Sequence, residues 1–505
     1  MAYKDNSHNS QLPFVSHLEC LSCGNRYSKA DLLKQFGTLY TMGDFGVVDG
    51  NPGCLGPLDI RYHMDNVRRI LTQQEVKRRY DGSPAFTMLR ELLPVDDIHI
   101  DGDTPFTPLV RAPKIEAKIK AQYGKEIQVY LKIEETPTGS FKFRPTSLAF
   151  NKALEDGGYL VSCTSSTFNL GRTTNWLAEK HTLGSLLFIP ASVGRHKIGV
   201  IDEHSTVELE EITTEDFKEK GDELIERYAA KLVEDIRDRK LSRQVVSFAG
   251  NYDKANRFSL QVADAANTKT EKEEGRMRVF IPNSIFRPYY KEGSKTYGFE
   301  VALQLMFQYG IPPYQPVKII YPIGSGALAC SATKGIRELN ELGIFQNPVR
   351  LYAAQAELVM PVVDAFRRYQ QTGQKDILPF RTDESGNRIH WNPAETLAQS
   401  IAIADPGSGP QTIDLIIETQ GGAISVAEEQ IVDGLIDLKE LEGILAQDVG
   451  GVALSALYNG IQNGDFNTGD VVVVGVTGIG LELMRDKLIE FAGRTGLEKE
   501  VARLL

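Results

Sequence analysis

The sequence has no long apolar run and no dense tract of positive charge. No hydrophobic stretch approaches the roughly 20 residues that cross a bilayer, and the polar start MAYKDNSHNS lacks the apolar segment of a signal peptide. We therefore expect a cytoplasmic protein without a membrane partner. The net charge of −11 argues against nucleic acid as a partner and favours a small-molecule ligand.

Cysteine is too scarce for a disulfide framework, because five residues are scattered over 505 positions. Cys20 and Cys23 form a Cys-x-x-Cys pair, and Cys54 follows in NPGCLGP, where Asn51 stands in the place of a fourth ligand. A tetrahedral thiolate site therefore lacks one donor. We predict no metal in this region, and name Cys20, Cys23 and Cys54 as the ligands that zinc would use.

From about residue 103, short apolar runs alternate with helix-length segments. Runs such as IQVYLKI, SLLFIP, VKIIYPIG and DVVVVGV are typical of buried parallel strands. The alternation predicts an α/β protein with mostly parallel sheets that are covered by helices on both faces. In such folds, ligands bind beyond the carboxyl ends of the strands.

Two polar stretches interrupt this alternation. Residues 201–243 are highly charged, but Leu224, Tyr228 and Leu232 recur at helical spacing, which predicts a surface helix with one packed face. The run TKTEKEEGR at 268–276 is interpreted as a loop.

One lysine stands in a context that suggests covalent chemistry. Lys142 follows the turn-forming Gly139 and Ser140 in ETPTGSFKFRPT. A lysine that is desolvated or lies near another cation has a lowered pKa, which exposes its amine for Schiff-base formation. Taken alone, the residue is more simply interpreted as a surface lysine in an ion pair, so the neighbouring motifs decide between the two.

A glycine-rich loop follows one of the apolar runs. In YPIGSGALACSA it lies between a strand and a helix, an arrangement that presents backbone N–H groups to a phosphate. The loop is neither a Walker A motif nor a GxGxxG fingerprint. Its candidate phosphate-binding residues are Gly324, Ser325, Gly326, Ala327 and Leu328.

A second loop, SCTSSTFNLGRTT at 162–174, supplies hydroxyls and an amide directly before a helical segment. Such a loop can bind a carboxylate through its side chains and the helix N-terminus. Alternatively, its serines and threonines only cap the helix.

Together and in this order, these stretches resemble the pyridoxal-phosphate enzymes of fold type II, and most closely the threonine synthases. The resemblance spans about residues 103 to 485 and includes DGDTPFTPLVRAP, EETPTGSFKFR, SSTFNLGR, YPIGSGAL and VVVVGVTGIGLE. NSIFRPYYKEGSKTYGFE singles out threonine synthases and their close relatives, such as cysteate synthase. The resemblance implies a tryptophan synthase β-like fold of two open sheets, pyridoxal 5'-phosphate as cofactor and a homodimer.

The resemblance also implies how the cofactor is held. Lys142 would form the Schiff base with it and later carry protons, and Asn169 would bond the 3-oxygen of its ring. Residues 324–328 would hold its phosphate, and Thr477 would face the pyridine nitrogen. A neutral hydroxyl at Thr477 keeps that nitrogen unprotonated and moderates the electron sink.

Two segments match the substrate-binding positions of the family. Ser166 and Thr167 match the loop that receives the substrate carboxylate. Asn283 and Ser284 match positions that contact the substrate phosphate in threonine synthases. The resemblance therefore implies a phosphorylated amino acid as substrate.

Several positions depart from the family pattern. Phe168 replaces the glycine before the loop asparagine, and Phe286 replaces an asparagine. A bulky ring at Phe168, where the substrate backbone would lie, predicts that a different side chain is accepted. An arginine usual in the second substrate motif is missing, and Arg287 or Arg172 would supply its charge.

We therefore expect a carbon–oxygen lyase that converts O-phosphohomoserine to threonine and phosphate. One alternative is β-replacement on a phosphoserine-like substrate, as in cysteate synthase. Another is a catalytically silent binding protein that has kept the fold. A nicotinamide oxidoreductase fits less well, because GxGxxG and its acidic partner are absent.

We predict three regions along the chain. Residues 1–102 form an appended N-terminal module, with a degenerate zinc-ribbon-like start followed by helices. Residues 103–140 and 276–505 form the large cofactor-binding domain. Residues 141–275 form a smaller domain that carries the charged helical insert near 201–243, and its closure over the large domain would exclude water.

Overall fold

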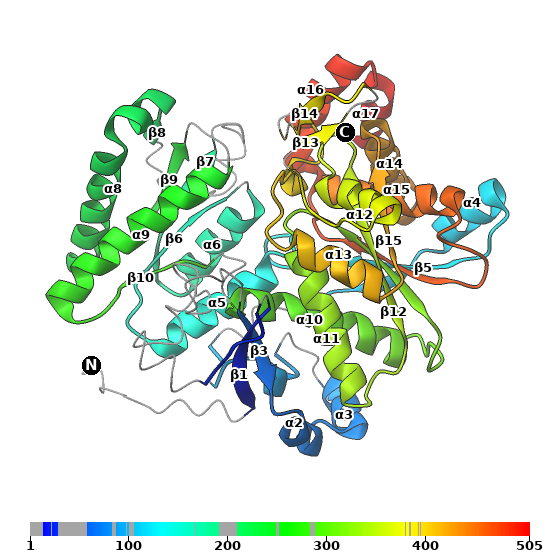
Figure 1. The fold of residues 1–505 in the computed structure, drawn as a ribbon, viewed down its shortest axis with the longest axis horizontal. Coiled ribbons are helices and arrows are strands. Elements are labelled where there is room, and N and C mark those ends of the chain that lie inside the picture. Colours follow the sequence, from blue (N-terminus) through cyan, green and yellow to red (C-terminus); the bar gives the residue numbers. More distant parts are fainter. Residues whose placement is uncertain are drawn as a thin grey trace.

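The fold consists of two mostly parallel sheets and a small antiparallel sheet near the N-terminus. In the computed structural model, the described residues are 14–21, 23–28, 58–82, 87–96, 98–99, 106–166, 168–190, 210–248, 252–282, 288–378, 380–382, 385–391, 393 and 395–505. Helix α10 (Pro288–Phe307) lies between the two parallel sheets (Figure 1). No helix within these ranges is long and apolar enough to cross a membrane.

The larger sheet combines strands from distant parts of the chain. Its spatial order is β15 (Gly422–Val426), β12 (Val349–Ala356), β11 (Val317–Pro322), β16 (Val471–Val476), β5 (Gln128–Ile133) and β4 (Leu109–Arg111). All neighbours are parallel except β4, which runs antiparallel to β5. Every residue of β16 is buried, which explains its continuous run of valines.

The smaller sheet has the order β10 (Val279–Phe280), β6 (Val161–Ser165), β7 (Gly184–Pro190), β9 (Arg243–Phe248) and β8 (Glu210–Ile212). All of its described pairs are parallel. Because β10 pairs with β6, this sheet includes a strand that follows residue 275. An apolar run indicates that a strand is present but not which neighbour it joins.

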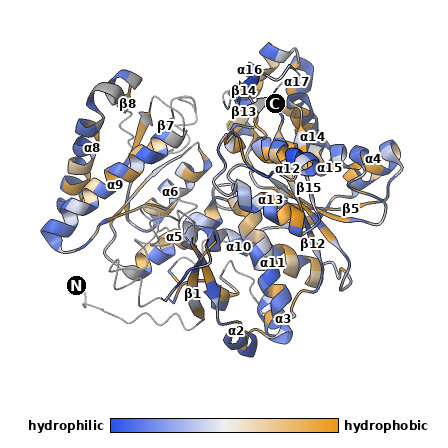
Figure 2. Ribbon diagram, in the orientation of Figure 1, coloured by the Kyte–Doolittle hydropathy of each residue, from blue (hydrophilic) through white to orange (hydrophobic). Residues whose placement is uncertain are grey.

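Helices connect the strands and cover the sheets, and Figure 2 shows that their hydrophilic faces point outward while the central strands are hydrophobic. They are α2 (Met64–Ile70), α3 (Gln73–Gly82), α4 (Pro113–Tyr123), α5 (Phe143–Asp156), α6 (Asn169–Lys180), α8 (Thr214–Arg237), α9 (Tyr252–Glu274), α11 (Ala327–Glu341), α12 (Pro361–Thr372), α13 (Gly409–Glu418), α14 (Glu428–Glu442), α15 (Asp448–Asn463), α16 (Arg485–Thr495) and α17 (Glu498–Leu504). Short 3₁₀ turns are η2 (Arg90–Leu92), η5 (Gln399–Ile401) and η6 (Leu481–Met484), and β13 (Phe380–Thr382) pairs with β14 (Arg388–His390).

Helix α8 confirms the helix predicted for the charged stretch, and its apolar side chains are buried beside α9. The loop predicted at 268–276 is wrong, because α9 continues to Glu274. Thr270 is fully buried in this segment, and the amide of Asn267 binds the backbone of β10. Tertiary packing therefore overrides the local polarity of the stretch.

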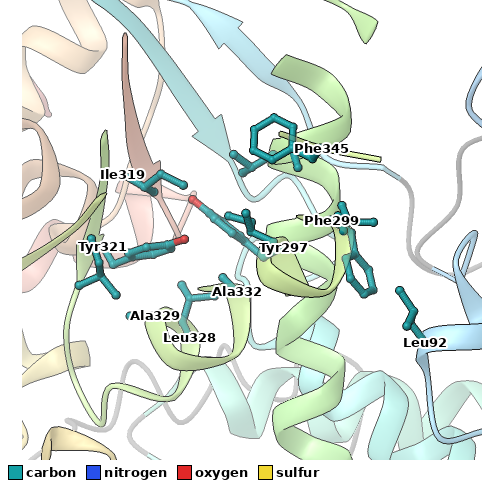
Figure 3. Close-up of a cluster of buried hydrophobic side chains, with 14 of the residues drawn as sticks. Leu92, Tyr297, Phe299, Ile319, Tyr321, Leu328, Ala329, Ala332 and Phe345 are labelled. Carbon is teal, nitrogen blue, oxygen red and sulfur yellow. The ribbon is translucent and has the colours of Figure 1, made fainter. Parts of the chain in front are cut away.

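The described part of the N-terminal region packs against the core of the larger domain. It forms the antiparallel sheet β2 (Arg26–Tyr27), β1 (Val15–Cys20) and β3 (Leu58–Tyr62), followed by α2 and α3. Leu92 packs beside Phe299 of α10 in the large hydrophobic core (Figure 3). The Lys291 amine of α10 also donates to the Leu58 carbonyl at 2.8 Å. The apolar pattern of the region indicated a packed face, but not its partner.

The zinc-ribbon-like start stays a prediction. Cys20 is buried and Cys23 is exposed, whereas Cys54 and Asn51 lie outside the described residues. Within the described ranges, no three His, Cys, Asp or Glu side chains come together in a way that suits a metal ion.

Candidate active site

A cavity lies where strands of both parallel sheets reach their carboxyl ends. Four predicted segments line it: Lys142 beyond β5, Asn169 beyond β6, residues 324–328 beyond β11 and Thr477 beyond β16. Parallel strands present their carboxyl ends at one edge of a sheet, so segments far apart in the sequence meet there. The structure therefore brings together the residues that the sequence analysis assigned to the cofactor.

The backbone before Lys142 is held by the end of β16. The Phe141 N–H donates to the Thr477 carbonyl at 3.0 Å, and the Ile479 N–H donates to the Gly139 carbonyl at 2.8 Å. Gly139 has φ +62°, and a Cβ there would lie 2.8 Å from the Ile479 carbonyl oxygen, so the turn requires glycine. These contacts place Lys142 at the residue directly before α5.

The Lys142 side chain has an apolar and aromatic environment. Its Nζ donates to the Tyr290 hydroxyl oxygen at 3.1 Å and lies 4.8 Å from the centre of the Phe141 ring. Burial lowers the pKa of its ammonium group, and the smaller opposing effect comes from Tyr252. Within the described residues no carboxylate pairs with this amine. Lys142 is therefore suited to act as a nucleophilic amine.

A fully buried group of charges anchors the start of α5. The Arg144 guanidinium donates to Glu134 at 2.7 Å and to Glu300 of α10 at 2.6 Å, and the Lys132 amine donates to Glu300 at 2.7 Å. These four side chains, which we call the Arg144 network, are at most 1% exposed. Although burial alone would raise the pKa of Glu300, Arg144 and Lys132 hold it below its ordinary value. The network thus fixes the chain two residues beyond Lys142.

The glycine loop has the geometry of a phosphate-binding turn. Gly326 has φ +85° directly before α11, and a Cβ there would lie 2.4 Å from Thr412 Oγ1. At Gly324 a Cβ would lie 3.3 Å from the backbone of Ile401, which lines the same cavity. The first N–H groups of α11, beginning at Ala327, have no acceptor within the helix and are suited to an anion.

Asn169, the first residue of α6, is oriented by a second amide. Its Nδ2 donates to Gln447 Oε1 at 2.9 Å, and Gln447 Nε2 donates to the Ile479 carbonyl at 2.8 Å. The Asn169 oxygen is buried without a hydrogen-bond partner, and one N–H of the amide is uncommitted. The orphaned amide, the glycine loop and the buried amine together fit pyridoxal phosphate. Sequence reasoning missed Gln447, because it belongs to no motif and reaches the site only through the fold.

Ser166 caps α6. Its hydroxyl oxygen accepts the N–H of Phe168 at 3.0 Å and that of Gly171 at 2.8 Å. This confirms the capping interpretation for Ser166. The residue also lines the cavity, and its own O–H is available as a donor there.

Phe168, whose ring was expected where the substrate backbone would lie, does not line the described cavity. Phe168 has φ +144°, a conformation that favours the glycine it replaces. Its ring is buried with Leu187, Ile189 and Val245 in the core of the smaller sheet, and it does not contribute to the described cavity wall. Burial of the ring offsets the backbone strain and turns the side chain away from the cavity.

Arg172 is also absent from the described cavity wall. Its guanidinium donates to the Thr138 carbonyl at 3.4 Å, which ties α6 to the loop before Lys142. The remaining predicted substrate contacts lie outside the described residues and stay predictions: Thr167, Asn283, Ser284 and Arg287.

Other cavity residues lacked an assigned role in the sequence analysis. Tyr252 at the start of α9 and the segment 399–403 both line the cavity. Each belongs to a stretch of the family resemblance, FAGNYDKA and ETLAQSIAIADPGS, which is the signal that would have found them. Tyr290 belongs to a further stretch of the resemblance, NSIFRPYYKEGSKTYGFE, but had no assigned role; it contacts Lys142 from the buried helix α10.

The comparison with protein families identifies the class of enzyme. The family described as pyridoxal-phosphate dependent enzyme matches residues 100–478. The chain belongs to this family. The predicted cofactor is therefore confirmed, and the protein is a pyridoxal-phosphate-dependent enzyme.

Known proteins of similar sequence are threonine synthases. The chain is 27% identical over 463 residues to the threonine synthase of Methanosarcina acetivorans, covering 92% of this chain and 91% of that protein. It is 26% identical over 466 residues to that of Methanocaldococcus jannaschii, covering 92% of each. The enzyme is thus threonine synthase-like in sequence.

Solved structures confirm the predicted fold type. Diaminopropionate ammonia lyase from Escherichia coli matches with a TM-score of 0.51 at 13% identity, covering 84% of this chain and 92% of that one. The processed form of threonine deaminase isoform 2 from Solanum lycopersicum matches with a TM-score of 0.51 at 14% identity, covering 86% and 89%. At these identities the likeness concerns the fold.

The cavity has the parts that chemistry on an amino acid requires. Bound pyridoxal phosphate supplies the electron sink that stabilises negative charge at the substrate's α-carbon. The Lys142 amine can take up and return a proton at Nζ, because it lacks a described carboxylate that would hold it as an ammonium ion. The glycine loop offers N–H groups to an anion, and Gln447 keeps the Asn169 amide in one orientation.

Proposed function

We propose that the protein is a threonine synthase, a lyase that converts O-phosphohomoserine to threonine and inorganic phosphate. Two observations support this. Threonine synthases match 92% of the chain. The cavity collects Lys142, Asn169, Thr477 and the glycine loop at one edge of the larger sheet.

In this proposal, each cavity residue has one task. Lys142 attaches the cofactor, removes the substrate's α-proton and carries protons in the later steps. Asn169 bonds the ring oxygen, Thr477 faces the ring nitrogen, and residues 324–328 hold the cofactor phosphate. The amide contact of Gln447 supports this arrangement, because it leaves one Asn169 N–H for the ring.

Two further segments would bind the substrate. Ser166 and Thr167 receive its carboxylate, and Asn283 and Ser284 receive its phosphate. Ser166 supports this assignment, since it lines the cavity and keeps its O–H as a donor.

Attachment of the cofactor to Lys142 can be tested by reduction with borohydride and peptide mapping. The wild type should give one reduced cofactor adduct at Lys142, and Lys142→Ala should give none. Lys180→Ala, which removes an exposed lysine at the end of α6, is the matched control and should retain the adduct. An adduct on another lysine, or a wild type that takes up no cofactor, would contradict the site assignment.

The substrate can be tested by phosphate release from the loaded enzyme. O-phosphohomoserine should release phosphate and yield threonine, whereas O-phosphoserine should not. Release from O-phosphoserine alone, dependent on an added nucleophile, would instead indicate the β-replacement reaction considered from the sequence.

We further propose that the enzyme is a homodimer in the cytoplasm and that the smaller domain closes over the larger one. Residues 141 to about 282 form the smaller sheet and its helices, which supports the two-domain division. Sedimentation of the loaded protein tests the dimer, and small-angle scattering with and without substrate tests closure.

A further inference from the structure

The buried hydroxyl behind Lys142 has no role in the proposed function so far. Tyr290 is 2% exposed, and its oxygen accepts the Lys142 Nζ–H at 3.1 Å. It does not line the described cavity, so it reaches the amine from the protein side while the opposite side of Lys142 faces the cavity. This is the single hydrogen bond of the Lys142 amine within the described residues.

Among the described residues, no charged group other than Lys142 itself contacts this pair. Tyr252 and Tyr290 are the titratable groups that face the amine, and burial raises the pKa of Tyr290 well above its ordinary value. The Arg144 network joins α5 and α10 to the end of β5, and its two cations balance its two carboxylates. Tyr290 therefore stays a neutral phenol, which both donates and accepts hydrogen bonds.

The packing of α10 on α5 fixes the distance between the two groups. At Gly293, one turn beyond Tyr290, a Cβ would lie 2.6 Å from the Arg144 carbonyl oxygen. Farther along α10, Thr296 Oγ1 and Glu300 accept hydrogen bonds from the Arg144 guanidinium at 3.2 and 2.6 Å. Three residues of α10, spaced about one turn apart, thus contact the segment that begins at Lys142. Tyr290 lies one turn before them, beside the amine.

We propose that the Tyr290 hydroxyl positions the Lys142 amine through a hydrogen bond and exchanges donor and acceptor roles with it during turnover. When Nζ takes the substrate's α-proton, the C–H bond breaks, its electron pair remains with the substrate, and the new ammonium donates an N–H to the Tyr290 oxygen. When the proton is delivered, the neutral amine again has a lone pair, to which the Tyr290 O–H can donate. Tyr290 keeps its own proton throughout and acts as a positioning residue.

The inference rests on the proposed role of Lys142 but not on the identity of the substrate. It predicts that Tyr290→Phe makes the ammonium form of Lys142 harder to solvate. In the full-length protein freed of cofactor, the pH midpoint for modification of Lys142 by cyanate, followed by mass spectrometry, should fall by about half to one pH unit. In the loaded enzyme, kcat should fall about tenfold with little change in KM.

Tyr297→Phe is the matched control. Tyr297 lies two turns further along α10, is fully buried, and its hydroxyl has no hydrogen-bond partner. Its loss should leave the labelling midpoint of Lys142 unchanged. An equal midpoint in Tyr290→Phe and the wild type, or an equal shift in both variants, would overturn the inference.

Two measurements separate the ways in which this test can fail. Borohydride trapping shows whether Lys142 carries the cofactor, so an adduct elsewhere refutes the site assignment rather than the role of Tyr290. Thermal unfolding shows whether Tyr290→Phe is folded. If it is not, 3-fluorotyrosine at position 290 keeps the ring size and weakens the acceptor. The labelling midpoint should then also fall, and an unchanged midpoint would overturn the inference.

Discussion

Helix α10 carries two buried groups of charge, and they differ in how well the charges are paired. The Arg144 network is closed, because two carboxylates share two cations and no member is more than 1% exposed. The second group joins α10 to the N-terminal sheet and to α11 and borders a cavity of about 670 Å³. We call it the Glu292 cluster, and its members are Asp59, Lys291, Glu292, Lys295, Lys334 and Glu338.

The two groups respond differently to burial. In the Arg144 network, the cations keep the pKa of Glu300 low despite burial. In the Glu292 cluster, burial outweighs the nearby lysines at Glu338 and raises its pKa, whereas Lys334 and Lys291 overcome burial at Asp59 and lower its pKa to about 2. The comparison indicates an anchor beside Lys142 in which the cations hold the pKa of Glu300 low, and a contact with a raised carboxyl pKa, at Glu338, where the N-terminal region joins the core.

The largest effect should come from opening the closed network. Arg144→Met leaves Glu134 and Glu300 buried without their guanidinium, which should cost about 3–5 kcal/mol of stability in urea unfolding. Arg337→Met is the control, because Arg337 forms a solvent-exposed pair with Glu418, and it should cost less than about 1 kcal/mol. Equal losses of stability in the two variants would contradict the distinction between the buried Arg144 network and an exposed ion pair.

A methyl group between α10 and α5 should have the next largest effect. In Gly293→Ala, the new Cβ would lie 2.6 Å from the Arg144 carbonyl and from Pro145 Cα, so the helices must separate. We expect a loss of about 1–3 kcal/mol in unfolding and weaker cofactor attachment. Gly493→Ala is the control in a helix. No atom lies within 4 Å of its new Cβ, so its stability should be equal to or higher than that of the wild type. A stable Gly293→Ala with normal cofactor uptake would contradict the proposed contact.

The pH dependence of stability should identify the titratable contact. A carboxyl whose folded pKa is raised keeps its proton in the folded state after the unfolded chain has lost it. Stability therefore falls as pH rises from about 4.5 toward neutrality. Glu338→Gln cannot ionise and should reduce this fall by on the order of 1 kcal/mol at neutral pH. Parallel stability curves for variant and wild type between pH 4.5 and 7 would assign the titration to another group.

The smallest effect is expected at an unpaired hydroxyl between the two groups. Figure 3 shows Tyr297 of α10 near Tyr321 of β11, and the Tyr297 hydroxyl has no hydrogen-bond partner within the described residues. Tyr297→Phe removes no bond and should change stability by less than about 0.5 kcal/mol, measured by urea unfolding. A loss above 1 kcal/mol would reveal a buried water or another partner at this hydroxyl.

Much of the candidate site was predictable from local sequence. Lys142 and the glycine loop carry local signals. The tight turn before Lys142 requires Gly139, and the turn between β11 and α11 requires Gly326, because both residues have a positive φ and no room for a Cβ. Asn169 was found through its family motif. Each of these residues stands at a strand or helix end, where backbone geometry restricts the residue type.

Other features depended on contacts that no local pattern encodes. Tyr290 contacts Lys142 from α10, and Gln447, the residue directly before α15, contacts Asn169. The ring of Phe168 turned out to lie in the core of the smaller sheet, because burial decides its direction. Likewise, polarity at 268–276 suggested a loop, but packing against β10 keeps that segment helical.

The sequence by itself determined the alternation of strands and helices, the turns that need glycine and the lysine that we propose joins the cofactor, because these depend on backbone conformation and side-chain chemistry within short segments. Only the tertiary structure decided which hydroxyl and which amide meet that amine and its neighbouring loop, and how the charges on α10 are paired. Such pairings follow from the distance between elements and from burial, which sets the energy of each buried charge and is a property of the whole fold.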